Sequence, residues 1–117
     1  MFDPDYINDK TKKDILQKIE GMDAKGGSNI LSGLEKAVEI LKKEKEKTKE
    51  NRVSSIILLS DWCDNYSNDK QLAQSLKKLI KGLNLSFTLN TFGYGYDHVP
   101  KIMNKLANIR DGSLFLV

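Results

Sequence analysis

The feature that most constrains this 117-residue chain is an unbroken apolar run, Ile-Ile-Leu-Leu at residues 56–59, within the segment 53–65. An apolar run without alternation is typical of a strand that helices bury on both faces. The run ends at Ser60, and Asp61 follows directly. Because open α/β sheets bind ligands beyond the carboxyl ends of their strands, the segment predicts an α/β fold with a ligand site near Asp61.

The composition indicates one globular domain and argues against several functions. Hydrophobic residues make up 39% of the chain and charged residues 30%, so there is enough apolar material for a core. Lysines alternate with glutamates in KKEKEKTKE at residues 42–50, which is typical of a solvated helix end, and the net charge is only +3. We therefore expect no nucleic-acid partner.

The sequence also bears on where in the cell the protein is located. No apolar run approaches the roughly 20 residues of a membrane span. Cys63 is the single cysteine and cannot form an intramolecular disulfide, which favours an intracellular, cytoplasmic location.

Hydrophobic periodicity predicts the order of elements around the central strand. It predicts helices at residues 10–20, 30–47, 69–81 and 97–109, and strands at residues 53–60, 84–92 and 114–117. From the first strand onward the two kinds alternate, which predicts a parallel sheet with right-handed crossovers. We expect residues 1–8 to form a loose leader and residues 9–117 a domain that is incomplete at both ends, since three strands are few for this class.

Several short motifs predict helix ends and turns. Asn8 or Asp9 is a candidate helix cap, and Gly21 suits a left-handed cap at the end of the same helix. Gly93-Tyr94-Gly95 predicts a sharp turn rather than a dinucleotide-binding loop, because His98 stands where the third glycine belongs. With one histidine and one cysteine, the sequence predicts no zinc cluster.

Two polar residues allow both a structural and a functional interpretation. Asp61 is either a turn-forming residue after a strand or a ligand-binding carboxylate at the sheet edge. Ser28, which follows Gly26-Gly27, is either the N-cap of the next helix or a hydroxyl directed to the same edge. Position alone leaves both pairs of alternatives open.

Three stretches occur in an order that resembles the von Willebrand factor type A domain: GGSNILSGLEKAVEIL, SIILLSDWCDN and NTFGYGYDHVPKIMNKLANIRDGSLFLV. The resemblance runs from about residue 10 to residue 117. It implies a Rossmann-like three-layer sandwich, with a mainly parallel sheet and helices on both faces, here truncated to about three strands and four to five helices. It also implies a non-catalytic protein-interaction module.

The resemblance further implies a partial metal site. In this family a divalent cation such as Mg²⁺ is held by three loops. Ser28 matches the threonine of the second loop and Asp61 the aspartate of the third, while Trp62 replaces the usual glycine after it. The first loop's Asp-x-Ser-x-Ser motif does not occur in the chain. Because Mg²⁺ prefers near-octahedral oxygen ligation, we expect weak metal binding or none.

The same resemblance indicates where a protein partner binds. An acidic side chain of the partner would complete the shell of the cation. The loop residues expected to frame that contact are Gly26, Gly27, Asn29, Trp62, Asp64, Asn65, Gly93, Tyr94 and Asp97. In the family the strand at residues 53–60 pairs with a strand that has no counterpart here, so we also expect self-association through its free edge.

Two alternatives stay open at this point. The chain is consistent with a fragment of a Rossmann-like enzyme that binds a phosphate or nucleotide at the same sheet edge. It is also consistent with a degenerate structural domain without a ligand, which Trp62 would favour. Substitution of Asp61 by alanine separates this last alternative from a binding module. Unchanged partner binding after the substitution would support the degenerate domain.

Overall fold

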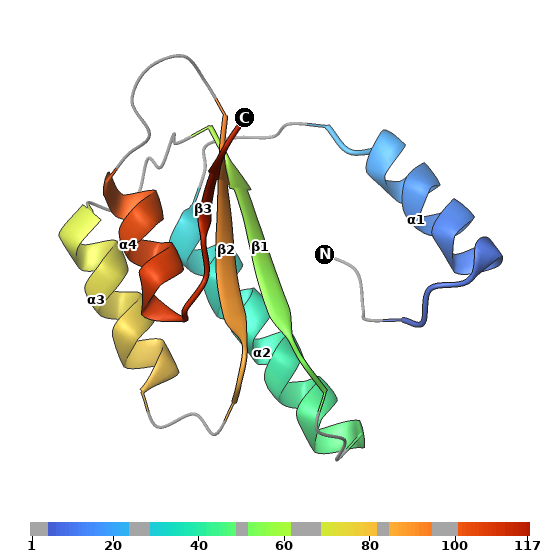
Figure 1. Cartoon of the computed structure of the whole chain (residues 1–117). Helices are drawn as coiled ribbons and strands as arrows, with labels where there is room; N and C mark the ends of the chain where they lie inside the picture. The colour runs from blue at the N-terminus through green and yellow to red at the C-terminus, as the bar shows by residue number, and fades with distance from the viewer. Residues whose placement is uncertain (1–4, 24–28, 49–51, 62–68, 82–84, 95–100) are drawn as a thin grey trace.

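A computed structural model describes residues 5–23, 29–48, 52–61, 69–81, 85–94 and 101–117 (Figure 1). The elements, in chain order, are α1 (Asp9–Glu20), α2 (Ile30–Thr48), β1 (Ser55–Ser60), α3 (Asp69–Ile80), β2 (Thr88–Gly93), α4 (Lys101–Ile109) and β3 (Leu114–Leu116). This order confirms the predicted alternation of strands and helices from the first strand onward.

The three described strands form one parallel sheet in the order β1-β2-β3. The register pairs Ser60 of β1 with Gly93 of β2, and Gly93 with Leu116 of β3. The carboxyl ends of all three strands therefore lie at one edge of the sheet. The predicted α/β class and parallel sheet are confirmed.

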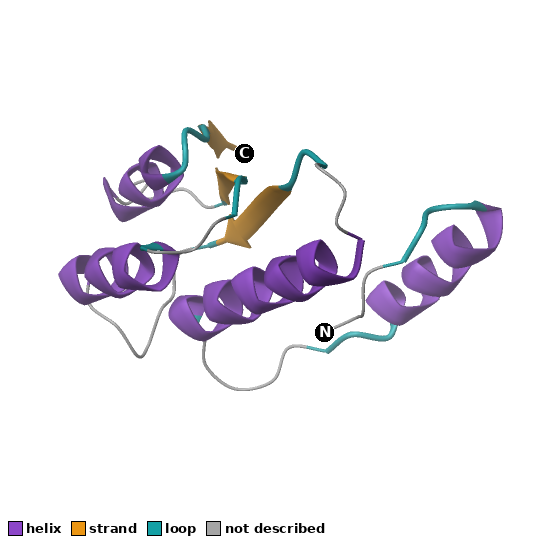
Figure 2. Ribbon diagram, turned by 90° about the horizontal axis from the view of Figure 1, so that it is seen from below, coloured by secondary structure: helices purple, strands orange, loops and turns teal. Residues whose placement is uncertain are grey.

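Helices α2, α3 and α4 lie together on one face of the sheet (Figures 1 and 2). Their apolar stripes meet the central strand in one buried cluster, made of Ile30, Leu34, Leu72, Leu76, Leu89, Met103 and Leu106. The described residues thus form two layers around this core, and not the three layers with helices on both faces that we expected. In this part of the chain no helix packs on the other face of the sheet, which we call the outer face.

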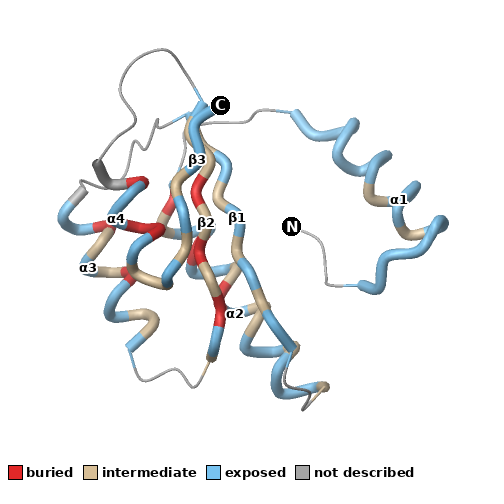
Figure 3. The backbone as a smooth tube through the Cα atoms, viewed as in Figure 1, coloured by how far each residue is buried: buried red, intermediate tan, exposed pale blue. Residues whose placement is uncertain are grey.

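The prediction that β1 is buried on both faces is wrong. Ile56 and Leu58 are half-buried against the helices, whereas Ile57 and Leu59 are 61% and 60% exposed on the outer face (Figure 3). An apolar run indicates that its side chains favour burial, but it does not show which elements cover them. Here the helices cover only every second residue of the strand.

Strand β2 is the central strand and the best-buried one. Leu89 and Thr91 are fully buried, and the Thr91 hydroxyl donates a hydrogen bond to the Met103 carbonyl at 3.1 Å. Strand β2 begins at Thr88 and not near residue 84 as predicted. Its pairing with β1 starts there, where Thr88 lies opposite Ser55. Phe87 just precedes it and is buried under the Arg110 guanidinium, 4.6 Å from the ring centroid.

Helix α1 stands apart from the sheet and the other helices in both views (Figures 1 and 2). Its start is as predicted, because the Asn8 side chain and Thr11 form a reciprocal capping box. The predicted left-handed cap at Gly21 is wrong, since this residue has φ −83°. None of the twelve residues of α1 is buried.

The charged end of α2 is solvated, as the mixed signs of its charges predict. Glu39 forms ion pairs with Lys36 at 3.2 Å and Lys43 at 2.7 Å, and Lys47 pairs with Glu44 at 3.4 Å. The hydrogen bonds from Lys43 and Lys36 lower the pKa of Glu39. Among the described residues, no helix is both long enough and apolar enough to cross a membrane.

Gly112 generates a test of the fold. A Cβ atom at this position would clash with the Leu89 carbonyl group, so the turn before β3 passes directly over the central strand. We expect Gly112→Ala to lower the free energy of unfolding by about 1–3 kcal/mol, the usual cost of overpacking. Chemical denaturation followed by circular dichroism measures this change.

Gly33 is the matched control. It lies in α2, and a Cβ atom added there would meet no atom beyond the helix's own backbone within 4 Å, so alanine fits without strain. We expect Gly33→Ala to raise stability by about 0.5–1 kcal/mol, because alanine favours the helix over glycine. Equal effects of the two substitutions would contradict the close approach of Gly112 to β2.

Candidate functional site

The candidate site lies at the carboxyl edge of the sheet, where backbone hydrogen bonds hold the three strand ends together. The Tyr94 N–H donates to the Ser60 carbonyl at 3.0 Å, and the Val117 N–H donates to the Gly93 carbonyl at 3.0 Å. Since Asp61 directly follows Ser60, its backbone lies beside that of Tyr94. The end of β1 and the end of β2 therefore present neighbouring side chains at this edge.

Asp61 and Tyr94 are both exposed at this position. A solvated carboxylate beside a phenol can accept and donate hydrogen bonds to a ligand without a large desolvation cost. Within the described residues no three histidine, cysteine, aspartate or glutamate side chains come close enough together to hold a metal ion. The described part of the site is thus a polar surface that presents a carboxylate and a phenol.

Helix α2 begins on the same side of the molecule (Figure 1). The Asn29 Oδ1 atom accepts a hydrogen bond from the Ser32 N–H at 3.0 Å, and the Asn29 carbonyl accepts one from the Gly33 N–H at 3.2 Å. Asn29 is therefore the N-cap of α2, whereas Ser28, the cap suggested by the sequence, lies outside the described residues. The buried side chain of Ile30 anchors this helix end to the core.

The structure places four of the residues predicted from sequence: Asn29, Asp61, Gly93 and Tyr94. Gly93 is not in a turn as predicted. It is the last residue of β2 and pairs with Ser60 on one side and Leu116 on the other. The remaining predicted residues lie outside the described residues: Gly26, Gly27, Ser28, Trp62, Asp64, Asn65 and Asp97.

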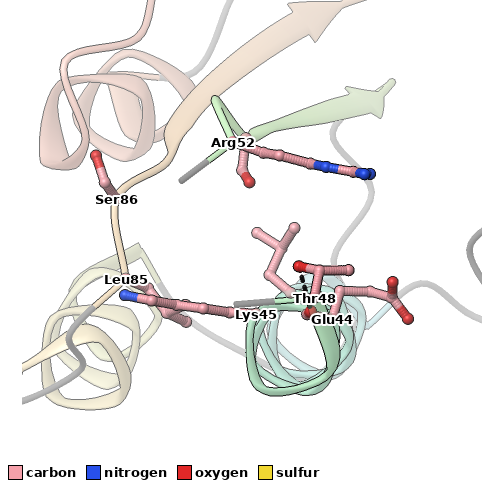
Figure 4. Close-up of a pocket in the computed structure, with 8 residues that line it drawn as sticks. Glu44, Lys45, Thr48, Arg52, Leu85 and Ser86 are labelled. Atoms are coloured by element: carbon pink, nitrogen blue, oxygen red, sulfur yellow. Dashed lines mark hydrogen bonds between the residues drawn. The ribbon is translucent and has the colours of Figure 1, made fainter. Parts of the chain in front are cut away.

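Sequence reasoning did not point to a small hollow between the carboxyl-terminal end of α2 and the segments that precede β1 and β2 (Figure 4). Its volume is about 90 Å³, and its lining includes Lys45, Arg52 and Ser86. Lys45 extends toward Leu85, whereas Arg52 points the other way (Figure 4). Pockets that enclose a metabolite usually measure about 300–1,000 Å³, so this hollow by itself is too small to enclose one.

Where parallel α/β domains bind ligands, they bind them beyond the carboxyl ends of the strands, and exposed Asp61 lies at this edge. The sequence matches a family described as "von Willebrand factor type A domain" over residues 2–114, so the chain belongs to this family. The resemblance predicted from the three sequence stretches is thereby confirmed. A comparison with curated proteins found no match.

The family implies a divalent cation at this edge, and the described residues supply few of the donor atoms that it requires. Mg²⁺ requires about six oxygen ligands in near-octahedral geometry. Asp61 supplies a carboxylate, but within the described residues it is not part of a group of three or more histidine, cysteine, aspartate or glutamate side chains. The sequence contains no Asp-x-Ser-x-Ser motif to supply the others.

Proposed function

We propose that this chain is a non-catalytic protein-binding module whose binding surface is the carboxyl edge of the sheet. The observation that carries the proposal is the placement of exposed Asp61 beside Tyr94, at the edge where α/β domains bind ligands. Membership of the von Willebrand factor type A family supports it over a phosphate-binding enzyme fragment. The proposal includes no covalent chemistry.

The residues at the start of α2 support the same binding surface. Asn29 caps α2, so the cap does not require the Ser28 hydroxyl. Ser28 is therefore the residue we assign to the hydroxyl position of the family site, with Asp61 as the carboxylate. In the complete family site a divalent cation would bridge such groups to an acidic side chain of the partner.

Asp61 provides the direct test of the binding function. Peptides are selected from a displayed random library on the wild-type domain in the presence of Mg²⁺, and binding is then measured to Asp61→Asn. We expect selected peptides to be rich in aspartate and glutamate and to lose most of their affinity for the variant. Glu46→Gln is the control, because it removes an exposed carboxylate at the far end of α2.

Equal affinity for wild type, Asp61→Asn and Glu46→Gln would contradict the proposal. It would favour the alternative of a degenerate structural domain, which Trp62 after Asp61 also favours. No covalent change in the peptides is expected in either case.

We further propose that the chain alone holds Mg²⁺ only weakly. One carboxylate and one hydroxyl leave most ligand positions to water, which Mg²⁺ retains without help from a protein. Calorimetric titration of the full chain with Mg²⁺ is expected to show no micromolar site. Detection of a micromolar site that Asp61→Asn abolishes would contradict this account.

We propose self-association through β1 as a second property. Among the described strands β1 pairs only with β2, so no described strand pairs with its other edge. Residues 55–60 include no charge and no proline, the usual devices that prevent edge pairing.

Size-exclusion chromatography tests this edge. We expect oligomers whose proportion grows with protein concentration, and less of them for Ile57→Lys, which puts a charge on an exposed position of the strand. A monomer at all concentrations would contradict the proposal.

We also propose that the chain works in a reducing compartment such as the cytoplasm. The support is compositional, because a single cysteine offers no intramolecular disulfide for an oxidising compartment.

A further inference from the structure

A second and larger hollow lies at the amino edge of the sheet, on the opposite side from Asp61. We call it the amino-edge hollow, and its volume is about 360 Å³. Its lining comes from the residues that lead into β1 and β2 and from the end of α4, and includes Ser54, Ser86, Thr88, Arg110 and Asp111. Ser54 and Ser86 also line the smaller hollow of Figure 4, so the two adjoin. This volume falls within the range of about 300–1,000 Å³ for pockets that hold small molecules.

Arg110 is a cation without an acidic partner in the part of the chain that the structure describes. Its guanidinium lies over the ring of buried Phe87, 4.6 Å from the centroid. The Arg110 Nε atom is buried and has no hydrogen-bond partner. Within the described residues Arg110 forms no ion pair, even with the adjacent Asp111. Because a guanidinium presents its donors in a fixed plane, a ring-stacked arginine is suited to bind an oxyanion at its edge.

The other lining residues supply hydroxyl groups, a carboxylate and an apolar side. Ser54 and Ser86 add hydroxyls, and Val53, which is almost fully exposed, adds apolar surface. Asp111 is exposed, and its carboxylate can accept hydrogen bonds from the hydroxyl groups of a ligand. The lining therefore suits a ligand that carries both an oxyanion and a polyhydroxy carbon skeleton.

Basic residues gather around this edge because the carboxyl-terminal ends of α2 and α3 lie there (Figure 1). The last turns of these helices carry lysines, which offset the negative ends of the helix dipoles: Lys45, Lys47, Lys77 and Lys78. Glu44 of α2 also lies here and pairs with Lys47 at 3.4 Å.

Arg52 adds a further positive charge at the lining of the hollow. Its Nη2 atom donates a hydrogen bond to the Tyr6 hydroxyl at 3.0 Å, so we assign it a contribution to the local field and no direct contact with the ligand. A surface of one sign of charge raises the local concentration of ligands of the opposite sign. The field at this edge thus favours the approach of an anion to Arg110.

We propose that the amino-edge hollow binds a phosphorylated small molecule of about the size of a sugar phosphate, with its phosphate on the guanidinium of Arg110. Two N–H donors of a guanidinium match two oxygens of a phosphate, which also brings the negative charge that no described residue pairs with Arg110. The sugar hydroxyls lie against Asp111 and Ser86. This inference concerns the edge opposite to the proposed protein-binding surface and does not depend on it.

Nuclear magnetic resonance titration of the full wild-type chain with ribose 5-phosphate tests the proposal. We expect saturable shifts of the backbone amides of Thr88, Arg110 and Asp111, and none at Tyr94 on the opposite edge. Ribose without a phosphate is expected to cause no shifts. Inorganic phosphate is expected to shift the same amides with a weaker affinity, because it makes no contact with the rest of the hollow.

Arg110→Gln tests the assigned residue. We expect it to weaken the binding of ribose 5-phosphate about tenfold or more, the effect of losing a charge-assisted hydrogen bond. Lys105→Gln is the matched control, because it removes an exposed positive charge from the same helix outside the lining of the hollow. We expect this control to leave the affinity nearly unchanged at about 0.15 M salt, which screens exposed charges.

Four results would overturn the proposal. Absence of shifts at Thr88, Arg110 and Asp111 in folded wild-type protein would mean that the hollow binds no sugar phosphate. Equal loss of affinity in Arg110→Gln and Lys105→Gln would mean attraction by general surface charge. Inorganic phosphate that binds as tightly as ribose 5-phosphate would make free phosphate the ligand. A phosphoserine peptide that binds more tightly than ribose 5-phosphate would make the ligand a modified protein.

Discussion

The structure depends on the packing of β2 against α4. Leu89 and Thr91 face Met103 and Leu106, all four are fully buried, and the Thr91 hydroxyl is bonded to the Met103 carbonyl. A buried hydroxyl without a partner would destabilise the core, so this bond fixes how α4 sits on the strand. Helices α2 and α3 add Ile30, Leu34, Leu72 and Leu76 to the same cluster, and the outer strands pair with β2 on either side.

The position of the candidate site follows from this core. Because β2 is fixed, its register with β1 places Ser60 opposite Gly93 and brings Asp61 beside Tyr94. The buried Ile30 anchors the start of α2 to the same cluster, which brings the Asn29 cap to that side of the molecule. The surface that we propose for partner binding is thus positioned by apolar contacts that lie well below it.

Part of the fold could be predicted from the sequence, for physical reasons. The 3.6-residue periodicity correctly predicted that α2, α3 and α4 are helices, because each of them has an apolar stripe that meets a single core. Periodicity could not show which elements cover β1, so Ile57 and Leu59 were expected to be buried. Local sequence rules did not predict two helix ends: Asn29 caps α2, and Gly21 ends α1 with a negative φ. Either residue of an adjacent polar pair can cap a helix, and glycine permits a left-handed conformation without requiring it.

Native-state hydrogen exchange of the full chain tests the central claim, that the fold is held by the one core around β2. The account predicts that the slowest-exchanging amides are those of β2 and of the α4 residues packed on it, with free energies of exchange equal to that of global unfolding. Amides of β2 that exchange as fast as those at the charged end of α2 would contradict it.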